Sequence, residues 1–530
     1  MAVFAWRRLL QYLRFFQQEG YDHGRFYRWL WQQRLFDTRF TLILGGLWLA
    51  TSLTPSHSIQ IGFLFFASAS LAFVSFNKEL DPRRTGKVRL VMTLRAKKLA
   101  VTTHLLFIAA SSLIFYATTA GATAPLSGFG VLATVGLMQL LPVLLIVSNF
   151  TLRPFEARIQ ASFKSDALQR LHACAPYTVG ITGSYGKTGA KAALGELLTQ
   201  CLGPTFWPPQ GINTVMGITR SIRQSLNQHH RYAVIEMGAY NIGSIKRLCD
   251  FTPPNAALVT SVGIMHLERF GSAENVYRAK SELAESVPSD GILVCNGDSS
   301  NARRMALEHP KRTTLLYGLQ PELGHLDVYA SEISFTSAGT TCNLHYKELV
   351  LKVVTPLLGR PALLNVLGAY TMACALGAEP HYAAACLANL KPVDNRLVYD
   401  KQPTVSYLRD AYNSNPIGFN AALEVLQAIP ASRRILMTPG MIELGEAQYT
   451  ENKRAAVTAA SVADLVIVVG ETNRAAFLDG LRESGYSKEQ TVIVDSRDEA
   501  FDYIRENGKT GDLVLLENDL GDLHEGRIRF

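Results

Sequence analysis

The sequence has few cysteines, and none is placed where a metal site or a disulfide framework would need it. All seven lie after residue 150, their number is odd, and no two form a Cys-x-x-Cys pair. Zinc sites and small disulfide-bonded domains need closely spaced cysteines, so both are excluded. The pattern instead indicates reduced thiols in a cytosolic part of the protein. These thiols are Cys174, Cys201, Cys249, Cys295, Cys342, Cys374 and Cys386.

The chain also lacks internal repeats, low-complexity tracts and the pattern of a cleaved signal peptide. No short apolar stretch with a small-residue cleavage site follows the first charged residues, so a cleaved leader is not expected. With 530 residues the chain is too long for one hydrophobic core. We therefore expect about three or four domains.

The net charge of +8 would suit a nucleic-acid partner, but its distribution argues against one. Much of the excess of Lys and Arg flanks apolar segments before residue 150, as at Arg28, Arg84 and Lys97. Basic residues beside apolar segments are typical of cytoplasmic loops next to a bilayer. The sequence thus predicts a membrane partner and no nucleic acid.

This membrane prediction rests on four apolar segments, at residues 40–53, 59–76, 99–120 and 128–150. A helix needs about 20 residues to cross a hydrocarbon core. The connections at 54–58 and 121–127 carry no Lys, Arg, Asp or Glu, whereas the alternate ones are basic. The pattern predicts four transmembrane helices over residues 40–150. We therefore expect a multi-pass protein of the cytoplasmic (inner) membrane, with its catalytic domains in the cytoplasm.

Residues 1–39, before these segments, are rich in Arg and aromatic residues. They fit an interfacial helix with its rings at the lipid headgroups, or a cytosolic helix that packs on its own protein. Both interpretations stay open. After the apolar segments, residues 151–176 read as a polar, basic linker.

From residue 177 the pattern changes to strand–helix alternation, which is typical of a parallel sheet with crossover helices. The fold class is therefore α/β, with a P-loop domain over 177–393 and a smaller Rossmann-like domain over 394–530. Short alternating strands between about 313 and 354 predict an antiparallel insertion. The strands expected are 177–182, 232–235, 256–260, 292–295, 404–408, 435–438, 465–469, 491–494 and 513–516.

A phosphate-binding loop is the strongest chemical signal. The sequence Thr-Gly-Ser-Tyr-Gly-Lys-Thr follows an apolar strand and opens a helix, so its backbone N–H groups can surround phosphate oxygens. The lysine would neutralise the β- and γ-phosphates of ATP, and the threonine hydroxyl after it would bind Mg²⁺. The loop residues are Thr182, Gly183, Ser184, Tyr185, Gly186, Lys187 and Thr188.

This loop resembles that of the Mur ligases of cell-wall synthesis, and further matches follow in the family's order over about residues 177–517. Asp-Ala-Tyr-Asn-Ser-Asn-Pro at 410–416 and Gly-Met-Ile-Glu-Leu-Gly at 440–445 resemble the member that adds D-alanyl-D-alanine. The metal positions match Thr188, Glu236, His266 and Lys280, of which the last is carbamylated in these ligases. The nucleotide positions match the phosphate loop, Asn296, Arg396 and Asp410, and the substrate positions match Asn213, Thr214, Tyr412 and Asn415.

The resemblance implies an ATP-dependent, ADP-forming ligase that joins a carboxylate to an amine through an acyl phosphate. Two anions must approach one another before phosphoryl transfer, so cations are needed. Lys187, His266 and Lys280 are the expected catalytic residues, and ATP and Mg²⁺ the cofactors. A carbamylated Lys280 would offer Mg²⁺ an anionic oxygen. The expected partners are an amino-acid or dipeptide amine and a carboxylate precursor of the cell envelope, with a lipid-linked acceptor as one hypothesis.

Three departures from the family limit this assignment. Apolar segments stand where the family has a UDP-binding domain. The family's central Gly-x-His-Asn-x-x-Asn appears at 359–365 without its His and first Asn, although Asn365 is kept. Glu517 and Asp519 fall where the D-alanyl-D-alanine ligase has a Lys-Gly-Ser run, so a basic group is replaced by acidic ones. The last change predicts a different specificity for the acceptor or the amine.

Other functions fit parts of the sequence. A capsule-type polyglutamate ligase also resembles Mur ligases and is membrane-associated. A membrane scaffold that binds ATP as a switch for envelope enzymes would keep the phosphate loop without catalysis. A transporter driven by a cytosolic ATPase is disfavoured, because the apolar segments show no convincing buried charge.

Overall fold

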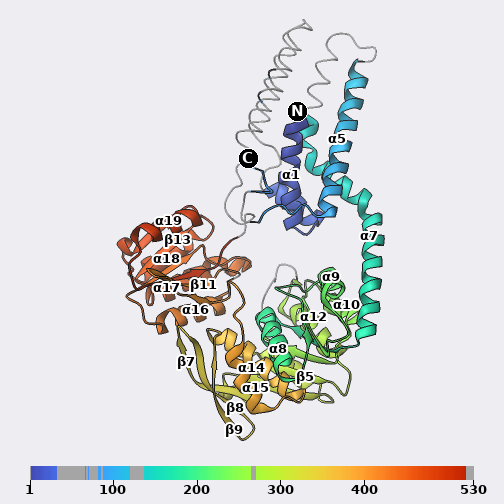
Figure 1. The fold of residues 1–530 in the computed structure, drawn as a ribbon. Helices are drawn as coiled ribbons and strands as arrows, with labels where there is room; N and C mark the ends of the chain where they lie inside the picture. The colour runs from blue at the N-terminus through green and yellow to red at the C-terminus, as the bar shows by residue number, and fades with distance from the viewer. Residues whose placement is uncertain are drawn as a thin grey trace. The chain divides into compact units, whose positions relative to one another are not determined.

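The computed structural model describes residues 2–32, 66, 70, 81–84, 88–119, 136–263, 270–412 and 414–520. The chain divides into two compact units, one of residues 1–161 with 520–530 and one of residues 162–519 (Figure 1). The first predicted transmembrane segment, and nearly all of the second, lie outside the described residues.

The described part of the N-terminal unit is helical, and several of its aromatic side chains are buried against the protein itself, whereas Tyr27 and Trp31 are exposed. Phe16, Phe26 and Trp29 pack with Leu99 and Leu141 in one core. Apolar residues recur every three or four positions along these helices, so one face is covered by neighbouring helices. This packing is compatible with a helix that packs on its own protein, but Tyr27 and Trp31 are exposed, so both interpretations of residues 1–39 stay open. The helices are α1 (Ala2–Gln18), α2 (His23–Gln32), α5 (Leu94–Thr119) and the first part of α7 (Leu141–Cys174).

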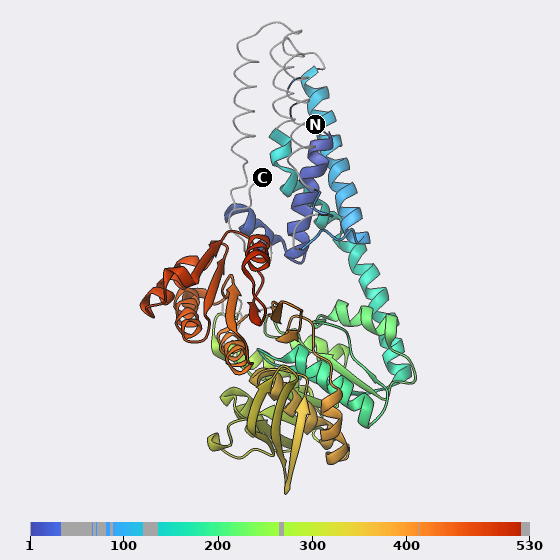
Figure 2. The same ribbon diagram turned by 60° about the vertical axis from the view of Figure 1, so that its left-hand side comes forward.

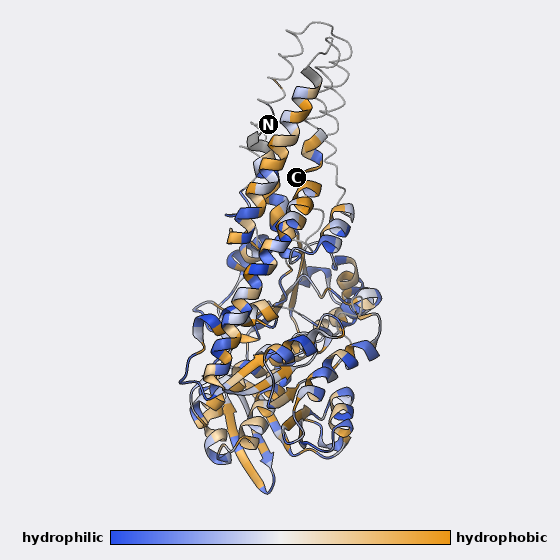
Figure 3. Cartoon of the chain, turned by 90° about the vertical axis from the view of Figure 1, so that its right-hand side faces the viewer, coloured by the Kyte–Doolittle hydropathy of each residue, from blue (hydrophilic) through white to orange (hydrophobic). Residues whose placement is uncertain are grey.

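Helix α5 contains the one stretch, Leu94–Ile114, that is long and apolar enough to cross a membrane among the described residues. Figure 3 shows its largely apolar colouring. The helix begins five residues before the predicted segment, and its basic first turns are held by polar contacts. Lys98 Nζ lies 3.2 Å from Glu156 Oε1, and Arg95 Nη2 donates to Asn149 Oδ1 at 3.0 Å. The described part of the chain does not support a four-helix transmembrane region.

Helix α7 is continuous from Leu141 to Cys174, so most of the predicted linker at 151–176 is helical, and the boundary between the two units falls within it, between residues 161 and 162. Pro154 lies inside this helix, and its basic and polar neighbours are largely exposed, as on any solvent-facing helix. The helix ends just before Pro176, which disfavours helical backbone at the residue before it. In the second unit, Ala167 and Leu171 of its last turns join a hydrophobic core.

The second unit contains two sheets, of which the first has nine strands in the order β2-β3-β1-β4-β5-β6-β7-β8-β9. Neighbours from β2 to β7 are parallel, and β7, β8 and β9 are antiparallel. The stretch predicted as an insertion therefore extends the same sheet, and its first strand, β6, is parallel. The strands are β1 (Tyr177–Thr182), β2 (Thr205–Phe206), β3 (Tyr232–Glu236), β4 (Ala256–Val259), β5 (Ile292–Asn296), β6 (Thr313–Gly318), β7 (Val328–Thr336), β8 (Gly339–Tyr346) and β9 (Leu349–Thr355).

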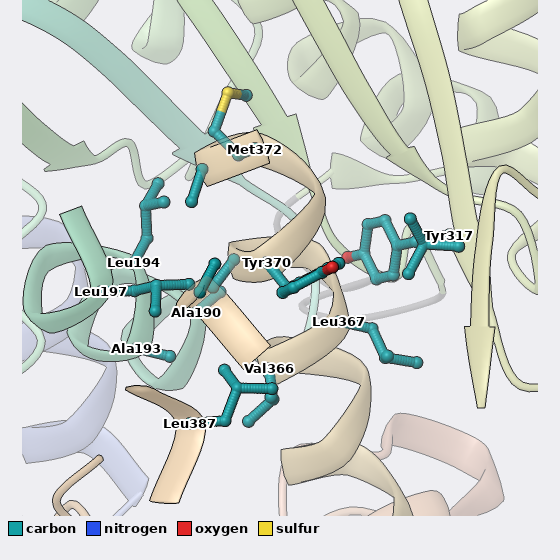
Figure 4. Close-up of a cluster of buried hydrophobic side chains, with 14 of the residues drawn as sticks. Ala190, Ala193, Leu194, Leu197, Tyr317, Val366, Leu367, Tyr370, Met372 and Leu387 are labelled. Atoms are coloured by element: carbon teal, nitrogen blue, oxygen red, sulfur yellow. The ribbon is translucent and has the colours of Figure 1, made fainter. Parts of the chain in front are cut away.

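Helices cover both faces of this sheet, because alternate residues of its central strands are apolar on both sides. One core joins α8 and α14 to the sheet, and Figure 4 shows Leu194, Val366 and Tyr317 within it. The other core packs α9, α10, α12 and α13 against the opposite face. The helices are α8 (Lys187–Cys201), α9 (Val215–Ser225), α10 (Ser244–Phe251), α12 (Ala273–Ser286), α13 (Ser300–Glu308), α14 (Arg360–Ala375) and α15 (Pro380–Cys386), with 3₁₀ turns η1 (Pro321–Leu323) and η2 (Leu387–Asn389).

The second sheet has six strands in the order β10-β11-β15-β12-β13-β14, all parallel to their neighbours except β10 (Figure 2). It has a hydrophobic core on each face. Its strands are β10 (Val398–Asp400), β11 (Val405–Asp410), β12 (Arg433–Thr438), β13 (Leu465–Val469), β14 (Thr491–Val494) and β15 (Asp512–Glu517). Its helices are α16 (Pro416–Ala428), α17 (Gln448–Ala460), α18 (Arg474–Glu483) and α19 (Arg497–Asn507), with 3₁₀ turns η3 (Gly445–Ala447) and η4 (Lys488–Gln490).

Candidate active site at the carboxyl ends of two sheets

The phosphate loop connects the end of β1 to the start of α8, at the edge where ligands bind in open parallel sheets. The loop is fixed by the neighbouring strand β4 and the residues after it. Ser184 N donates to Ser261 O at 2.6 Å, and Thr260 Oγ1 donates to Tyr185 O at 2.5 Å. At its start, Thr182 Oγ1 donates to a backbone carbonyl after β3 at 3.1 Å. The loop is therefore shaped before any ligand binds.

Two glycines are required in this loop for different reasons. A Cβ on Gly183 would collide with the Thr260 hydroxyl. Gly186 has a φ of +83°, and a Cβ there would collide with the side-chain oxygen of Asn365. Asn365 of α14 thus lies directly against the phosphate loop. In the sequence, Asn365 was recognisable only as the last residue of an incomplete family motif.

Lys187 is held over the loop by the loop's own carbonyls. Its Nζ donates to Gly183 O at 2.6 Å and to Ser184 O at 3.1 Å. Burial lowers the pKa of this lysine from its usual value, with the charge of Arg396 acting in the same direction and that of Glu236 opposing it. An anion at the loop would compensate this desolvated ammonium group, as a phosphate does.

Glu236 ends β3, and the structure brings it together with two of the predicted residues. Thr188 Oγ1 donates to Glu236 Oε2 at 3.0 Å, and Asn213 Nδ2 donates to Glu236 Oε1 at 3.1 Å. The glutamate is 1% exposed. A hydroxyl and a carboxylate at one point are the oxygen ligands that Mg²⁺ prefers, so this pair fits the expected metal.

Lys191 belongs to this site, although the sequence analysis did not single it out. Its Nζ lies 3.2 Å from Glu236 Oε2 and also donates to Gln210 O. Burial lowers the pKa of Lys191, and Glu236 partly offsets the shift. Lys191 follows Lys187 by four residues, so both project from the same face of α8. That spacing was the signal available in the sequence.

Lys280 of α12 lies under the phosphate loop, where its Nζ donates to Gly183 O at 2.8 Å. The side chain is 4% exposed and has no carboxylate partner in the part of the chain that the structure describes. Burial lowers the pKa of Lys280 far below its usual value, and the charge of Lys187 lowers it further. The predicted ligand His266 lies outside the described residues. Within those residues, no three His, Cys, Asp or Glu side chains could hold a metal together.

A cavity of about 700 Å³ separates the phosphate loop from the second sheet, which is ample for a nucleotide. Tyr185 and Gly186 line one wall, and Arg396 and Asp410 the other. Asn296 also faces the cavity, where its Nδ2 donates to Ser261 Oγ at 3.2 Å. The predicted nucleotide residues therefore share one cavity.

Arg396 lies between the two sheets, and its guanidinium stacks on the Tyr412 ring at 4.5 Å. Its neighbours Asn395 and Leu397 have left-handed backbone, with φ of 57° and 48°. Burial raises the pKa of Asp410 to about 7, although Arg396 and a backbone hydrogen bond from Leu397 oppose the shift. The junction thus combines local backbone strain with the side chains that face the cavity.

Two predicted substrate residues serve as helix caps. Asn415 Oδ1 accepts from Gly418 N at 3.1 Å at the start of α16, and Thr214 Oγ1 accepts from Gly217 N at 3.3 Å at the start of α9. Asn415 also lines the cavity. The first N–H groups of a helix have no partner within the helix, so capping alone explains an asparagine or threonine at the N-cap position.

Comparisons with known proteins agree with this geometry. The model of the Mur ligase middle domain matches residues 181–373, and that of the Mur ligase glutamate ligase domain matches residues 395–517. The chain is 34% identical over 301 residues to the UDP-N-acetylmuramoyl-tripeptide–D-alanyl-D-alanine ligase of Escherichia coli, covering 56% of this chain and 65% of that protein. The Mycobacterium tuberculosis ligase of the same name is 30% identical over 360 residues, covering 64% and 69%.

Solved structures show the same fold. MurF from Acinetobacter baumannii superposes with a TM-score of 0.59 at 24% identity, covering 68% of this chain and 77% of that one. MurF from Thermotoga maritima in complex with ADP superposes with a TM-score of 0.58 at 25% identity, covering 68% and 80%. The matches to the curated relatives in Escherichia coli and Mycobacterium tuberculosis span about two thirds of their length.

These findings contradict the predicted multi-pass location in the inner membrane. The similar proteins are named as ligases of a UDP-linked precursor, and the described residues hold a single helix with the length and composition of a membrane span. The prediction rested on basic residues beside apolar stretches. That pattern also arises where apolar helices pack on one another, as α1 and α5 do. The hypothesis of a lipid-linked acceptor depended on the same location and is dropped with it.

Proposed function

Because the chain belongs to the Mur ligase family of ATP-dependent, ADP-forming amide-bond ligases, we propose that it joins D-alanyl-D-alanine to a UDP-N-acetylmuramoyl tripeptide. The choice of substrates follows the names of the relatives and the resemblance at residues 410–416 and 440–445. The family models begin to match at residue 181. The two models cover the middle and glutamate ligase domains, so the test varies the uridine nucleotide separately.

One observation carries the proposal: the phosphate loop, the carboxylate at the end of β3 and the cavity converge at one edge. Lys187 contacts the loop carbonyls, Thr188 contacts Glu236, and the loop lines the cavity. A scaffold that only bound ATP would need the loop but not a buried Glu236 paired with Lys191. The arrangement favours phosphoryl transfer.

In the proposed reaction, the acceptor carboxylate attacks the γ-phosphate of ATP, and an acyl phosphate and ADP form. The amine then attacks the acyl carbon, an amide bond forms, and phosphate leaves. Lys187 and the loop N–H groups would offset the charge on the phosphates as it develops. Thr188 and Glu236 would hold Mg²⁺, which supplies Lewis-acid neutralisation of the phosphate oxygens when bound.

Lys280 is proposed to be carbamylated. A neutral amine adds to CO₂, with loss of one proton, to give an anionic carbamate. The buried, unpaired Lys280 has a pKa that favours the neutral amine, which is the reactive form. As a carbamate it would present oxygen atoms beside the phosphate loop. Together with this carbamate, His266 is proposed as a ligand of a second Mg²⁺, which would bring the acceptor carboxylate in line.

The test is ATP turnover by the full chain with Mg²⁺, UDP-N-acetylmuramoyl tripeptide and D-alanyl-D-alanine, followed by mass spectrometry of the product. We expect ADP release that depends on both substrates and a product with the mass of the joined peptide. A parallel reaction with a muramoyl tripeptide that lacks UDP shows whether the nucleotide is recognised. Product formation only from glutamate polymers would instead support the polyglutamate ligase.

A further inference from the structure

Lys191 and Glu236 face each other where the proposed metal ligands meet. Lys191 Nζ lies 3.2 Å from Glu236 Oε2, and both side chains are almost wholly buried. The same oxygen accepts a hydrogen bond from Thr188 Oγ1 at 3.0 Å. A carboxylate oxygen has two lone pairs, so Thr188 and Lys191 together use the full capacity of Oε2. A metal ion held by Thr188 and this oxygen would therefore compete with the ammonium group of Lys191.

Lys191 has a second acceptor, which would keep its ammonium group inside the site. Its Nζ also donates to the backbone carbonyl of Gln210, in the loop between β2 and α9. Gln210 has a φ of +50°, a left-handed backbone that persists only where its surroundings fix it. Asn213 of the same loop donates to Glu236 Oε1 at 3.1 Å. The loop thus contacts both partners of the ion pair, and Lys191 can leave Glu236 without leaving the site.

The charges of Lys191 and Glu236 cancel, and this balance decides what the site can accept. A divalent cation that entered alone would leave a buried ammonium group without its carboxylate, which is costly. A nucleotide brings the negative charge of its phosphates to the phosphate loop. Lys191 lies one helical turn after Lys187, on the same face of α8. The phosphates that compensate Lys187 would therefore also compensate a displaced Lys191.

We propose that Lys191 occupies the cation position on Glu236 until a nucleotide binds, and that it thereby makes metal binding at this site depend on the nucleotide. This inference rests on the proposed metal site at Thr188 and Glu236. Without nucleotide, the ion pair keeps the site neutral and disfavours a metal ion on its own. With nucleotide and metal bound, the ammonium group keeps the Gln210 carbonyl and faces the phosphates.

The sign of one effect separates this role from a purely structural one. A lysine that only held Glu236 in place would leave a misplaced ligand when removed, and metal binding would weaken. A lysine that competes with the metal has the opposite effect, because its removal leaves Glu236 Oε2 open to the cation. Loss of the Lys191 charge should therefore raise the affinity for metal in the absence of nucleotide.

The experiment titrates Mn²⁺ into the full chain without nucleotide and follows free Mn²⁺ by electron paramagnetic resonance, so no turnover is needed. Mn²⁺ takes the same oxygen ligands as Mg²⁺. We expect weak binding by the unsubstituted protein and an affinity about tenfold to a hundredfold higher in Lys191→Met, which keeps the length of the side chain and removes its charge. Lys246→Met, at an exposed lysine paired with Asp250, is the matched control and should not change the affinity.

A second titration repeats the measurement with ADP, which fills the phosphate loop without reacting. ADP should raise the affinity for Mn²⁺ in both proteins, partly because its phosphates bind the ion themselves. The rise should be smaller in Lys191→Met by the same factor of about tenfold to a hundredfold, because no ammonium group remains to be displaced. This difference measures how far Lys191 couples the metal to the nucleotide.

Two further variants separate charge from shape and test the metal site itself. Lys191→Arg keeps the positive charge and should bind Mn²⁺ alone as weakly as the unsubstituted protein. Glu236→Gln, added to Lys191→Met, should lower the gained affinity about tenfold or more. Circular dichroism checks that each variant is folded. If Lys191→Met does not fold, Lys191→Gln replaces it, since its amide is uncharged and can still donate to the Gln210 carbonyl.

The outcomes distinguish the inference from the function on which it rests. If the uncharged variant binds Mn²⁺ alone no tighter than the unsubstituted protein, Lys191 has only a structural role and the inference is overturned. An equal rise with ADP in both proteins overturns it as well, and so does a tighter binding of Mn²⁺ by Lys191→Arg. If Glu236→Gln leaves the affinity unchanged in the Lys191→Met background, the metal does not bind at Glu236 and the proposed metal site itself fails.

Discussion

Lys191 and Glu236 form an ion pair in which both side chains are almost wholly buried, with Nζ 3.2 Å from Oε2. The same glutamate accepts hydrogen bonds from Thr188 and Asn213. Glu236 is therefore held in place by the protein alone, before metal or nucleotide binds. A metal cation that binds at Glu236 Oε2 would have to displace Lys191 Nζ, so this ion pair would have to open when Mg²⁺ binds.

Lys191→Met should destabilise the protein, because it leaves Glu236 buried without its charge partner. We expect the free energy of unfolding to fall by about 3–5 kcal/mol, as for other broken buried pairs. Urea denaturation measures it. The double variant Lys191→Met with Glu236→Gln removes both charges and should recover part of the loss. A double variant no more stable than the single one would show that the pair is not what holds this region.

Lys187→Ala should strongly reduce catalysis with little effect on stability, because among the described residues its ammonium donates hydrogen bonds only to two loop carbonyls. We expect kcat to fall by about 10²- to 10³-fold, the loss seen when one charge-stabilising group is removed. ADP release and the melting temperature are the measurements. Lys246→Ala, an exposed lysine paired with Asp250, is the control and should keep full activity. A Lys187→Ala protein with normal turnover would remove the phosphate loop from the mechanism.

Gly186→Ala should weaken ATP binding, because the new methyl group needs a left-handed backbone and meets Asn365. Gly485→Ala is the matched control, with φ of +69° and open space around its Cβ. The control should cost about 1–2 kcal/mol of stability and leave KM for ATP unchanged. For Gly186→Ala we expect a rise in KM of about tenfold or more. Equal effects of the two substitutions would mean that strain alone, and not the shape of the loop, matters.

Turnover should depend on dissolved CO₂ if Lys280 is carbamylated. Burial lowers the pKa of Lys280 far below its usual value, which increases the fraction of neutral amine, the form that reacts with CO₂. We expect ADP release to drop in CO₂-depleted buffer and to return on addition of bicarbonate. Lys280→Arg cannot form the carbamate and should be inactive in both buffers. ADP release that does not depend on bicarbonate would count against the carbamylation of Lys280.

Asp410 should make stability fall as pH rises from about 4 to 7. Its folded-state pKa of about 7 lies above the usual 3.8, so the folded protein holds a proton that the unfolded chain has released in this window. The contribution is present below pH 4 and lost through pH 7. Asp410→Asn cannot ionise and should show a flatter pH dependence, with a higher melting temperature than the unsubstituted protein at pH 8. The same slope in both proteins would assign the titration to another group.

The parts of the fold that depend on local pattern were predictable. The strands that became β1, β3 and β12 are short apolar runs with turn signals at their ends, and the phosphate loop has its glycines and lysine in sequence. Such signals need no knowledge of neighbours in space. The helical state of residues 151–174 was not predictable, because a polar helix and a polar loop have the same composition.

The missing parts of the site depend on tertiary contacts. Lys191 looks like an ordinary helix lysine in the sequence, because only the fold brings Glu236 of β3 beside it. Asn365 lies 178 positions after Lys187 in the sequence, yet its side chain lies against the phosphate loop. The N-terminal region shows the same limit. Its aromatic and basic pattern suits a lipid surface or a helix packed in protein, and the described helices bury Phe16 and Phe26 while they leave Trp31 exposed.

The cavity has its two walls on separate sheets, which the chain joins at residues 394–397, where Asn395 and Leu397 hold left-handed backbone. A compound wedged between Tyr185 on one wall and Ile417 on the other could therefore act as a spacer. It would hold the reacting groups apart without imitating ATP, peptide or dipeptide. Selectivity for such a compound would come from the shape of the junction between the two sheets.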